Sequence, residues 1–356
     1  MPGLRSCASG LTRVHQLLSA AGPYDAVSGQ ALAWQRVLAQ RGLAGDVHAV
    51  YRDPRAAGEI RPIEQLDAAA GDLLVLHYSA HAPRLRELLD GPWRLALVHH
   101  NITPARYLWH HGAFAAGACA LGRRELPRYV EAADAVAGVS AFNARELEAA
   151  GAEQADVVPI FLDPGRLSAR GRTPTGDGPL VLVVGRLVPN KRHDLAIESF
   201  ALLRRELEPR ARLLCVGEAL SGEYRELVEG MAGEGVTLAG GLSQPDLNAA
   251  YASALVLLSA SEHEGFCVPL LEAFAFGVPV VARPAGGMPE VGGDAVLWAG
   301  EEPFDPAVAA ELLHAAISDS ELRAELADRG QARLEEYAPE RVAERIVAFA
   351  ERALSW

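Results

Sequence analysis

Residues 261–282, SEHEGFCVPLLEAFAFGVPVVA, place two carboxylates around the expected start of a helix. Glu264 and Glu272 are separated by seven residues. Pro269 suits the first turn of a helix and Gly277 suits its end, so the pattern predicts a helix between them. Glu264 then lies in the loop at the end of a strand, and Glu272 lies in the first turns of the helix.

The backbone between the two glutamates can bind an anion. Its N–H groups belong to Gly265, Phe266, Cys267 and Val268. A helix N-terminus offers unpaired donors and a partial positive charge, which suit a phosphate. The flanking carboxylates can accept hydrogen bonds from hydroxyls, and a sugar attached to a nucleoside diphosphate presents both kinds of group. The alternative is a buried strand–helix connection with two solvated glutamates.

A second segment, VVGRLVPNKRHD (183–194), contains Lys191, the only lysine among the 33 basic residues of the chain. Arg186 follows Gly185 directly at the end of a neighbouring apolar run, so both cations are expected at the same carboxyl edge. A compact ammonium on a flexible stem can follow charge as it builds on a departing phosphate, whereas a guanidinium fixes its partner in one geometry. The alternative is one surviving surface lysine.

Length and charge limit the function classes. At 356 residues the chain suits two domains. The net charge is −13, and residues 1–170 carry 17 basic and 17 acidic side chains, so the second half holds the whole excess. Nucleic acid is therefore not an expected partner, because phosphate backbones need a basic footprint. An anion bound by the second half must be held locally, by amides and a few cations.

We also expect a protein without transmembrane segments. No stretch approaches the ~20 apolar residues of a membrane span. The N-terminus has no basic start followed by a long apolar run, so a signal peptide is not expected. The four cysteines lack C-x-x-C spacing and are interpreted as reduced thiols, neither disulfides nor a zinc site. A cytoplasmic location follows, with at most loose attachment to a membrane.

The second half alternates strands and helices. Glycine, proline, threonine and charged residues at 170–179 indicate an interdomain linker. Strands are predicted at 180–185, 212–217, 236–240, 255–260 and 278–282. Helices are predicted at 194–207 and 223–232, after the N-cap Ser243, and after Pro269. This alternation predicts a doubly wound parallel α/β sheet that binds ligands at the carboxyl ends of its strands.

The first half shows the same alternation less clearly. Strands are predicted at 14–20, 46–51, 72–78, 95–100 and 133–140, with a loop at 21–30 and a helix at 30–42. The fold class is therefore α/β, with two Rossmann-like domains, 1–170 and 171–338, facing a central cleft. The amphipathic segment PERVAERIVAFAERAL predicts a final helix within 339–356, which we expect to pack back on the first domain.

These motifs resemble glycosyltransferase family 4. The resemblance is carried by G-R-x-x-P-N-K, by the E-x7-E stretch within 261–282 and by AGGMPE (285–290) in the donor half. HHNITPARYLW (99–109) and GVSAFNARELEAAG (138–151) are similar to segments of the acceptor half. The resemblance runs from about residue 25 to 345, and it implies the GT-B fold and a retaining, metal-independent enzyme without a cofactor.

The resemblance implies roles for individual residues. Arg186 and Lys191 would contact the diphosphate. Glu272 would accept hydrogen bonds from the ribose hydroxyls, and Glu264 would contact hydroxyls of the transferred sugar. His100 would lie in the cleft near the reacting sugar; its alternative is a core or metal-site histidine. The segment Gly265–Val268 would lie near the sugar and phosphates, with Cys267 contributing only its N–H.

The first loop departs from the family pattern. Many relatives have a Gly-Gly-rich turn where this chain has YDAVSGQAL (24–32). Ser28 and Gly29 are expected to let the backbone approach the diphosphate. Asp25 either orients the acceptor or forms a turn, and Asn101 is placed on the acceptor side. The pairs His99/His100 and His110/His111 lack a matching acidic or cysteine cluster, so no metal is expected.

The expected activity is transfer of a sugar from a UDP- or GDP-type nucleotide sugar to a hydroxyl of a glycan, lipid-linked or small-molecule acceptor. Two alternatives keep the fold and change the reaction: a sugar-nucleotide epimerase and a glycoside phosphorylase. A third is a non-catalytic nucleotide-sugar-binding protein. The sequence leaves the base, the sugar and the acceptor open.

Overall fold

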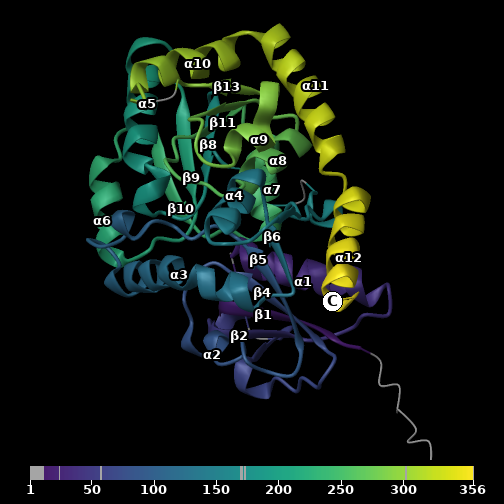
Figure 1. Ribbon diagram of the computed structural model, residues 1–356. Helices are drawn as coiled ribbons and strands as arrows, with labels where there is room; N and C mark the ends of the chain where they lie inside the picture. The colour runs from purple at the N-terminus through teal and green to yellow at the C-terminus, as the bar shows by residue number, and fades with distance from the viewer. Residues whose placement is uncertain are drawn as a thin grey trace, which may run out of the picture.

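The computed structural model of the chain describes residues 12–23, 25–56, 58–168, 171, 174–300 and 303–355. Two parallel sheets, each with helices on both faces, lie one above the other (Figure 1). Cys7 and part of the linker predicted at 170–179 lie outside the described residues. Among the described residues, no helix is long and apolar enough to cross a membrane.

The first domain is built on a seven-stranded parallel sheet of order β3-β2-β1-β4-β5-β6-β7. The strands are β1 (Val14–Ala21), β2 (Val47–Arg52), β3 (Ile60–Pro62), β4 (Leu73–Tyr78), β5 (Arg94–His99), β6 (Ala135–Gly138) and β7 (Asp156–Val157). Its helices are α1 (Ala26–Ala39), α2 (Pro83–Arg86), α3 (Ala113–Ala132) and α4 (Ala141–Ala149). The central strands β1 and β4 are buried nearly throughout, which explains their continuous apolar character.

The second domain holds a six-stranded parallel sheet of order β10-β9-β8-β11-β12-β13. The strands are β8 (Leu180–Val184), β9 (Arg212–Val216), β10 (Val236–Gly240), β11 (Val256–Ser259), β12 (Val280–Ala282) and β13 (Val296–Trp298). Its helices are α5 (His193–Glu206), α6 (Gly222–Met231), α7 (Gln244–Ser253), α8 (Val268–Ala275), α9 (Met288–Gly292), α10 (Pro306–Ser318) and α11 (Ser320–Glu336). Both sheets have the strand order of Rossmann folds, which confirms the predicted fold class.

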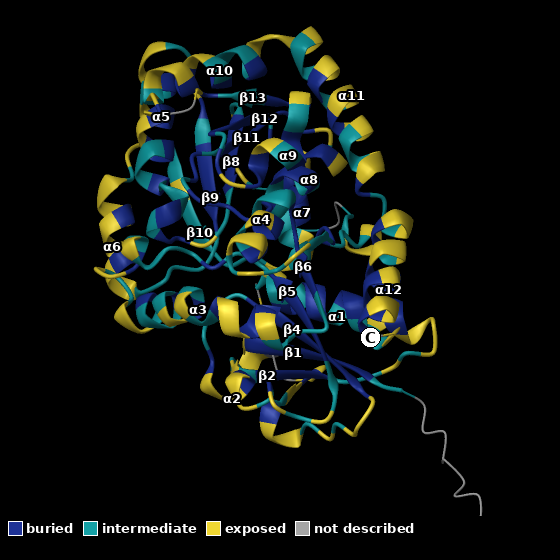
Figure 2. Cartoon of the chain, in the orientation of Figure 1, coloured by how far each residue is buried: buried dark blue, intermediate teal, exposed yellow. Residues whose placement is uncertain are grey.

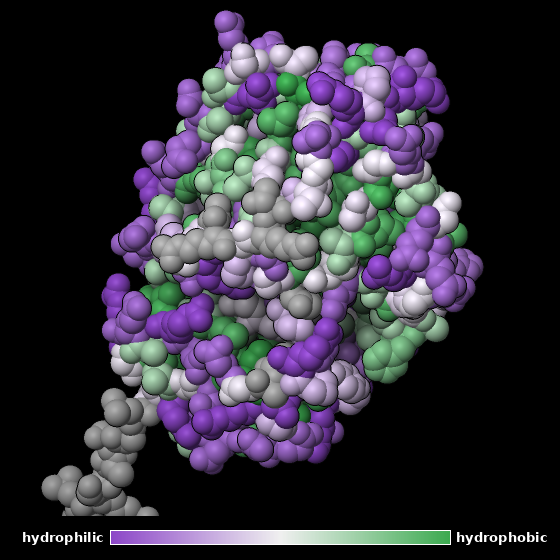
Figure 3. Space-filling view, turned by 180° about the vertical axis from the view of Figure 1, so that it is seen from behind, coloured by the Kyte–Doolittle hydropathy of each residue, from purple (hydrophilic) through white to green (hydrophobic). Residues whose placement is uncertain are grey.

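The last helix, α12 (Pro339–Ser355), leaves the second domain and packs against α1 and β5 of the first (Figure 1). Its amphipathic pattern supplies the buried face of this contact, which includes Ile346 and Phe349. Figure 2 shows the central strands of both sheets as buried and the outer sides of the helices as exposed. Seen from behind, hydrophilic side chains spread over both domains, and hydrophobic side chains form smaller groups among these hydrophilic residues (Figure 3).

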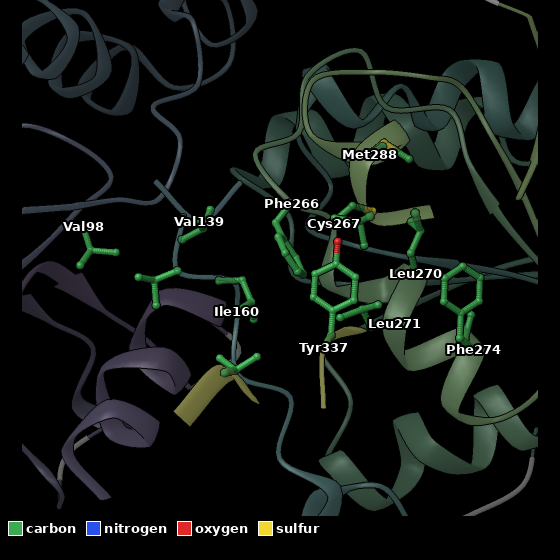
Figure 4. Packing of buried hydrophobic residues seen from close by; sticks show 14 of the residues in the cluster. Val98, Val139, Ile160, Phe266, Cys267, Leu270, Leu271, Phe274, Met288 and Tyr337 are labelled. Atoms are coloured by element: carbon green, nitrogen blue, oxygen red, sulfur yellow. The ribbon is translucent and has the colours of Figure 1, made fainter. Parts of the chain in front are cut away.

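One hydrophobic cluster crosses from the first domain to the second (Figure 4). Val98, Val139 and Ile160 line its first-domain side. Phe266 meets the ring of Tyr337 edge-to-face, with centroids 5.5 Å apart. The segment that leads into α12 therefore packs against the loop before α8.

The loop predicted at 21–30 is wrong from Ala26 onward, because α1 begins there. Asp25 is the N-cap, and its carboxylate accepts hydrogen bonds from the amide and the hydroxyl of Ser28, at 2.9 and 2.7 Å. Gly29 lies in the first turn, where its N–H donates to the carbonyl of Asp25. The capping signal of Asp25 outweighs the Gly and Ser residues that indicated a loop.

Candidate active site

Lys191 ends a short 3₁₀ turn, Pro189–Lys191, that follows β8. Its ammonium forms an ion pair with Glu264 Oε1, and 22% of the lysine side chain stays exposed. Asn190 ties the same two loops together, because its carbonyl accepts the amide of Glu262 at 2.8 Å and its side chain donates to the His263 carbonyl at 3.2 Å. The sole lysine and the first glutamate of E-x7-E thus share one site.

Arg186 lies at the same edge of the sheet and is exposed. It forms no ion pair or hydrogen bond with any residue that the structure describes. Its charge reaches α3 of the first domain: burial raises the pKa of the Cys119 thiol, and the positive charges of Arg186 and Arg123 oppose this rise. The Arg186 guanidinium therefore has no partner among the described residues.

The loop before α8, at the same edge of the sheet, has unpaired amides. Cys267 is the N-cap residue, with a left-handed φ of 72°, and its side chain forms no capping hydrogen bond. Over the described part of the chain, the N–H groups of Gly265, Phe266, Cys267 and Val268 have no acceptor. Burial raises the pKa of the Cys267 thiol, so the thiol stays protonated. The helix N-terminus is therefore open to an anion.

Glu272 lies one turn into α8. Tyr251 donates its hydroxyl hydrogen to Glu272 Oε2 at 2.8 Å, and no described residue donates to the other oxygen. Burial raises the pKa of Glu272, and the hydrogen bond from Tyr251 opposes this rise. One carboxylate oxygen therefore remains able to accept hydrogen bonds from a ligand.

The first domain contributes His100 and Asn101 at the end of β5. The amide of His100 donates to the Tyr78 carbonyl at 2.9 Å, which extends the pairing of β5 with β4. Asn101 has a φ of 70°, and a Cβ added to Gly265 would lie 2.4 Å from Asn101 Cβ. Only glycine fits at 265, because the two domains touch there backbone to side chain.

Backbone strain gathers at these loops. The described residues with positive φ other than glycine are Asn101, Arg192 and Cys267. Arg192 precedes α5, and its guanidinium pairs with Asp194 and Glu262. All three lie at strand ends or helix starts on the facing edges of the two sheets. Such strain is commonly held at functional sites.

Sequence reasoning assigned no role to Ser140 and Glu290, which join the two domains. Ser140 caps α4 and donates its hydroxyl hydrogen to the Gly265 carbonyl at 2.6 Å. Glu290 of α9 accepts the amide of Ala141 with both carboxylate oxygens, at 2.9 and 2.8 Å. An acidic group at a helix N-terminus is favourable. The spacing of Ser140 before α4 resembles an N-cap, but nothing in the sequence pairs Glu290 with it.

His99 and His100 are hydrogen-bonded to side chains of the first domain. His99 Nε2 lies 2.9 Å from Glu146 Oε2, and His100 bonds to His77. Within the described residues, one group could hold a metal: His15, Asp46 and His48. These residues lie at the amino ends of β1 and β2, away from the edge that carries Lys191.

The proposed site residues thus fall into two sets. Arg186, Lys191, Glu264, Glu272 and the amides of Gly265–Val268 lie at the carboxyl edge of the second sheet, with His100 and Asn101 facing them. Asp25, Ser28 and Gly29 form the first turn of α1, where a Cβ on Gly29 would lie 3.6 Å from Arg166. There the amide of Ser28 is already bonded to Asp25.

Part of the chain is similar in sequence to known glycosyltransferases. Residues 168–333 match the sequence model of the family described as "Glycosyl transferases group 1". A GDP-mannose-dependent alpha-(1-6)-phosphatidylinositol monomannoside mannosyltransferase of Mycolicibacterium smegmatis is 37% identical over 141 residues, which cover 36% of each chain. A D-inositol 3-phosphate glycosyltransferase of Salinispora arenicola is 35% identical over 190 residues, which cover 50% of this chain and 42% of the relative.

Solved structures match over almost the whole chain. A glycosyltransferase from Rickettsia africae superposes with a TM-score of 0.71 at 14% identity, over 96% of this chain and 99% of the other. HepE of Anabaena, in complex with UDP and glucose, gives a TM-score of 0.71 at 17% identity, over 94% and 98%. At these identities the likeness shows the two-domain GT-B fold. Residues 168–333, a little under half of the chain, thus match the glycosyl transferases of group 1, in keeping with the resemblance to family 4.

Proposed function

We propose that the protein is a retaining glycosyltransferase that moves a sugar from a nucleoside-diphosphate sugar to an acceptor hydroxyl. The main support is the gathering of Lys191, Glu264, an open Glu272 oxygen and the unpaired α8 amides at one sheet edge. A diphosphate needs cations and N–H donors, whereas sugars need hydrogen-bond acceptors. This edge supplies both, in a half of the chain that is otherwise negatively charged.

In this proposal, charge stabilisation provides most of the catalysis. Negative charge grows on the leaving diphosphate as the bond between sugar and phosphate breaks. Arg186 and the α8 amides stabilise it from fixed positions, and the flexible ammonium of Lys191 turns toward it. Glu264 pairs with the Lys191 ammonium. In the proposed complex Lys191 also contacts the phosphates, and Glu264 also contacts sugar hydroxyls. The leaving phosphate accepts the proton of the acceptor hydroxyl on the same face, which gives retention. No cofactor is required.

The two carboxylates do not suit the acid–base pair of a glycosidase. Such a pair must flank the scissile bond from opposite sides. Here Glu264 is paired with Lys191, and Glu272 lies one turn into a helix whose N-terminus is open to phosphate. The same arrangement supports metal independence, because the cationic side chains and amides would take the place of a divalent cation. Activity should therefore persist in the presence of a chelator.

The donor is proposed to be of UDP or GDP type. The mycobacterial relative is named for its dependence on GDP-mannose, and HepE was solved with UDP and with UDP-glucose. The named acceptors of relatives include an inositol phosphate and a phosphatidylinositol mannoside. The matches cover less than half of the length of these relatives, so we leave the acceptor class as glycan, lipid-linked or small molecule.

Product analysis tests this proposal. Purified protein is incubated with UDP-glucose or GDP-mannose, with and without a panel of acceptors, and nucleoside diphosphate and glycosylated product are measured. We expect release that depends on acceptor, with the anomeric configuration of the donor kept in the product. Conversion of donor alone would indicate an epimerase, dependence on inorganic phosphate would indicate a phosphorylase, and binding without turnover would indicate a sensor.

A further inference from the structure

A chain of hydrogen bonds leads from His100 into the core of the first domain. His77 Nδ1 lies 2.8 Å from His100 Nε2, and His77 Nε2 lies 2.8 Å from Gln16 Oε1. Gln16 and His77 lie on the neighbouring strands β1 and β4, and both are fully buried. Trp34 of α1 packs edge-on against the His77 ring, with centroids 5.3 Å apart. Solvent therefore cannot supply a proton or an acceptor to the inner part of this chain.

The orientation of Gln16 sets the direction of the chain. Its Nε2 donates to the carbonyl of Val14 at 3.3 Å, which leaves Oε1 facing His77. A rotated amide would place Oε1 against the Val14 carbonyl, which is also an acceptor, and both groups would lose their bond. Since Oε1 can only accept, the proton of the inner bond is on His77 Nε2.

The direction of the inner hydrogen bond also determines the direction of the bond between His77 and His100. Burial lowers the pKa of His77 to about 3, so this imidazole is neutral and carries a single proton. Its Nδ1 is therefore an acceptor, and His100 Nε2 must donate to it. Burial also lowers the pKa of His100, so the second imidazole is neutral and its Nδ1 has no proton. Among the described residues, nothing bonds to this Nδ1, and His100 is partly exposed at the sheet edge.

We propose that Gln16 and His77 are positioning residues that keep the proton of His100 on Nε2, so that Nδ1 accepts a hydrogen bond from a hydroxyl of the transferred sugar. That the hydroxyl belongs to the transferred sugar rests on the proposed transferase function; the position of the proton on His100 does not. A lone pair at Nδ1 suits a hydroxyl hydrogen and repels phosphate oxygens. The chain thus helps to direct the sugar, and not the diphosphate, toward the first domain.

Nitrogen NMR of histidine-labelled protein without substrate tests the position of the proton directly. The two ring nitrogens are told apart by their couplings to the ring protons, and the His100 signals are assigned by their loss in His100→Gln. We expect the unprotonated nitrogen of wild-type His100 to be Nδ1. An unprotonated Nε2, or a mixture of both forms, would overturn the proposal.

Two variants break the chain at different points. Gln16→Met removes the inner acceptor and His77→Met removes the outer one, and each should give His100 a mixture of tautomers. His48→Gln is the matched control, because His48 is a fully buried histidine of the same sheet, on β2, outside this chain. A folded Gln16→Met protein with an unchanged single tautomer would refute the role of Gln16. The wild-type measurement decides the proton position even if neither variant folds.

Donor binding tests the contact with the sugar. Addition of a binding nucleotide sugar should shift the wild-type His100 Nδ1 resonance, whereas the nucleoside diphosphate alone should not. The turnover of Gln16→Met should fall by about tenfold, which is the equivalent of one hydrogen bond. The turnover of the control His48→Gln should stay near that of the wild type. A resonance unmoved by a sugar donor that is shown to bind would overturn the contact. If His100 has the expected tautomer but the protein transfers no sugar, only the proposed transferase function is refuted.

Discussion

At the scale of residues, the most informative side chain is Lys191. In a chain that otherwise uses arginine, its ammonium lies in the ion pair with Glu264 and keeps part of its surface open. A flexible point charge can stay near Glu264 and still turn toward a phosphate, which a bidentate guanidinium does less readily. We infer that the position requires a mobile charge.

Lys191→Ala is predicted to lower turnover by about tenfold or more and to weaken donor binding much less, since the ammonium acts mainly on charge that develops in the transition state. Steady-state kinetics and calorimetric titration with the nucleoside diphosphate measure the two effects. Arg205→Ala, which removes an exposed cation from α5, is the control. Equal small losses in both quantities would contradict this role for Lys191.

Glu272→Ala is predicted to weaken binding of the free nucleotide by about tenfold or more, as expected for the loss of hydrogen bonds to a charged acceptor. Tyr251→Phe removes the protein's own hydrogen bond to Glu272 and keeps the carboxylate, so its effect on the dissociation constant should be much smaller. A Glu272→Ala protein with wild-type nucleotide affinity would show that the ribose lies elsewhere.

The sequence spacing predicted which residues lie at the same edge of the sheet, but not which of them form ion pairs. Glu264 and Lys191 each follow a strand of the same sheet, so parallel topology brings them together. Their ion pair depends on the path of two loops, one of which is fixed by the hydrogen bonds of Asn190. Sequence patterns carry no signal for that path. The capping of α1 by Asp25 was readable in principle, because Asp before a helical run is an N-cap signal.

At the scale of elements, the loops that contain Asn101 and Gly265 can touch because Gly265 has no side chain. Gly265 meets Asn101, whose left-handed backbone turns its side chain toward the second domain. The elements behind them, β5 and α8, are regular. The strain is therefore confined to the loops that connect these elements at the junction.

Gly265→Ala is predicted to lower kcat/KM by about tenfold or more, because the added Cβ would push the two loops apart by a fraction of an ångström or more. Asn101→Gly removes the group it meets and tolerates the positive φ. The double variant should therefore recover part of the activity lost in Gly265→Ala, in a double-mutant cycle. Strictly additive losses would show that the two positions do not interact.

Glu146 joins α4 to β5 and α3, and it predicts how stability depends on pH. Burial alone would raise its pKa, but the hydrogen bond from His99 and the charge of Arg123 lower the pKa to about 2. A depressed folded-state pKa gives stability that is complete above the unfolded value and is lost as pH falls below about 4.5.

Glu146→Gln should therefore lower the free energy of unfolding at pH 7, by at most on the order of 3 kcal/mol. The difference from wild type should shrink as pH falls through the range from about 4.5 to about 2. Denaturant titrations at several pH values measure it, with Glu148→Gln on the exposed side of α4 as the control. A difference that does not change with pH would contradict the depressed pKa.

The strands were easier to predict than the helices. Five apolar runs in the second half correspond to β8 to β12. Strands buried on both faces, such as β8 and β12, need continuous apolar sequence, whereas the edge strand β10 is only partly buried. Helix α3, with Gly117, Gly122 and Pro127 in its sequence, has weak periodicity and was not predicted. Edge strands β3 and β7 are too short to leave a pattern.

At the scale of the whole molecule, the two domains are joined at several independent places. Glu290 caps α4, Arg55 of the first domain pairs with Glu218 of the second, and α12 lies against α1. The shared hydrophobic cluster includes Phe266 and Cys267 of the loop before α8 (Figure 4). The facing site edges therefore keep a defined relation to each other. Sequence could predict two sheets and their active edges, but the contacts between domains depend on tertiary packing.

The central claim is that Arg186, Lys191 and the amides opening α8 together hold a donor pyrophosphate. A crystal structure with bound UDP or GDP tests it most directly. We expect phosphate oxygens within hydrogen-bond distance of Lys191 Nζ, of the Arg186 guanidinium and of at least one amide from Gly265 to Val268. A nucleotide bound elsewhere, or phosphates that touch none of these groups, would contradict the account.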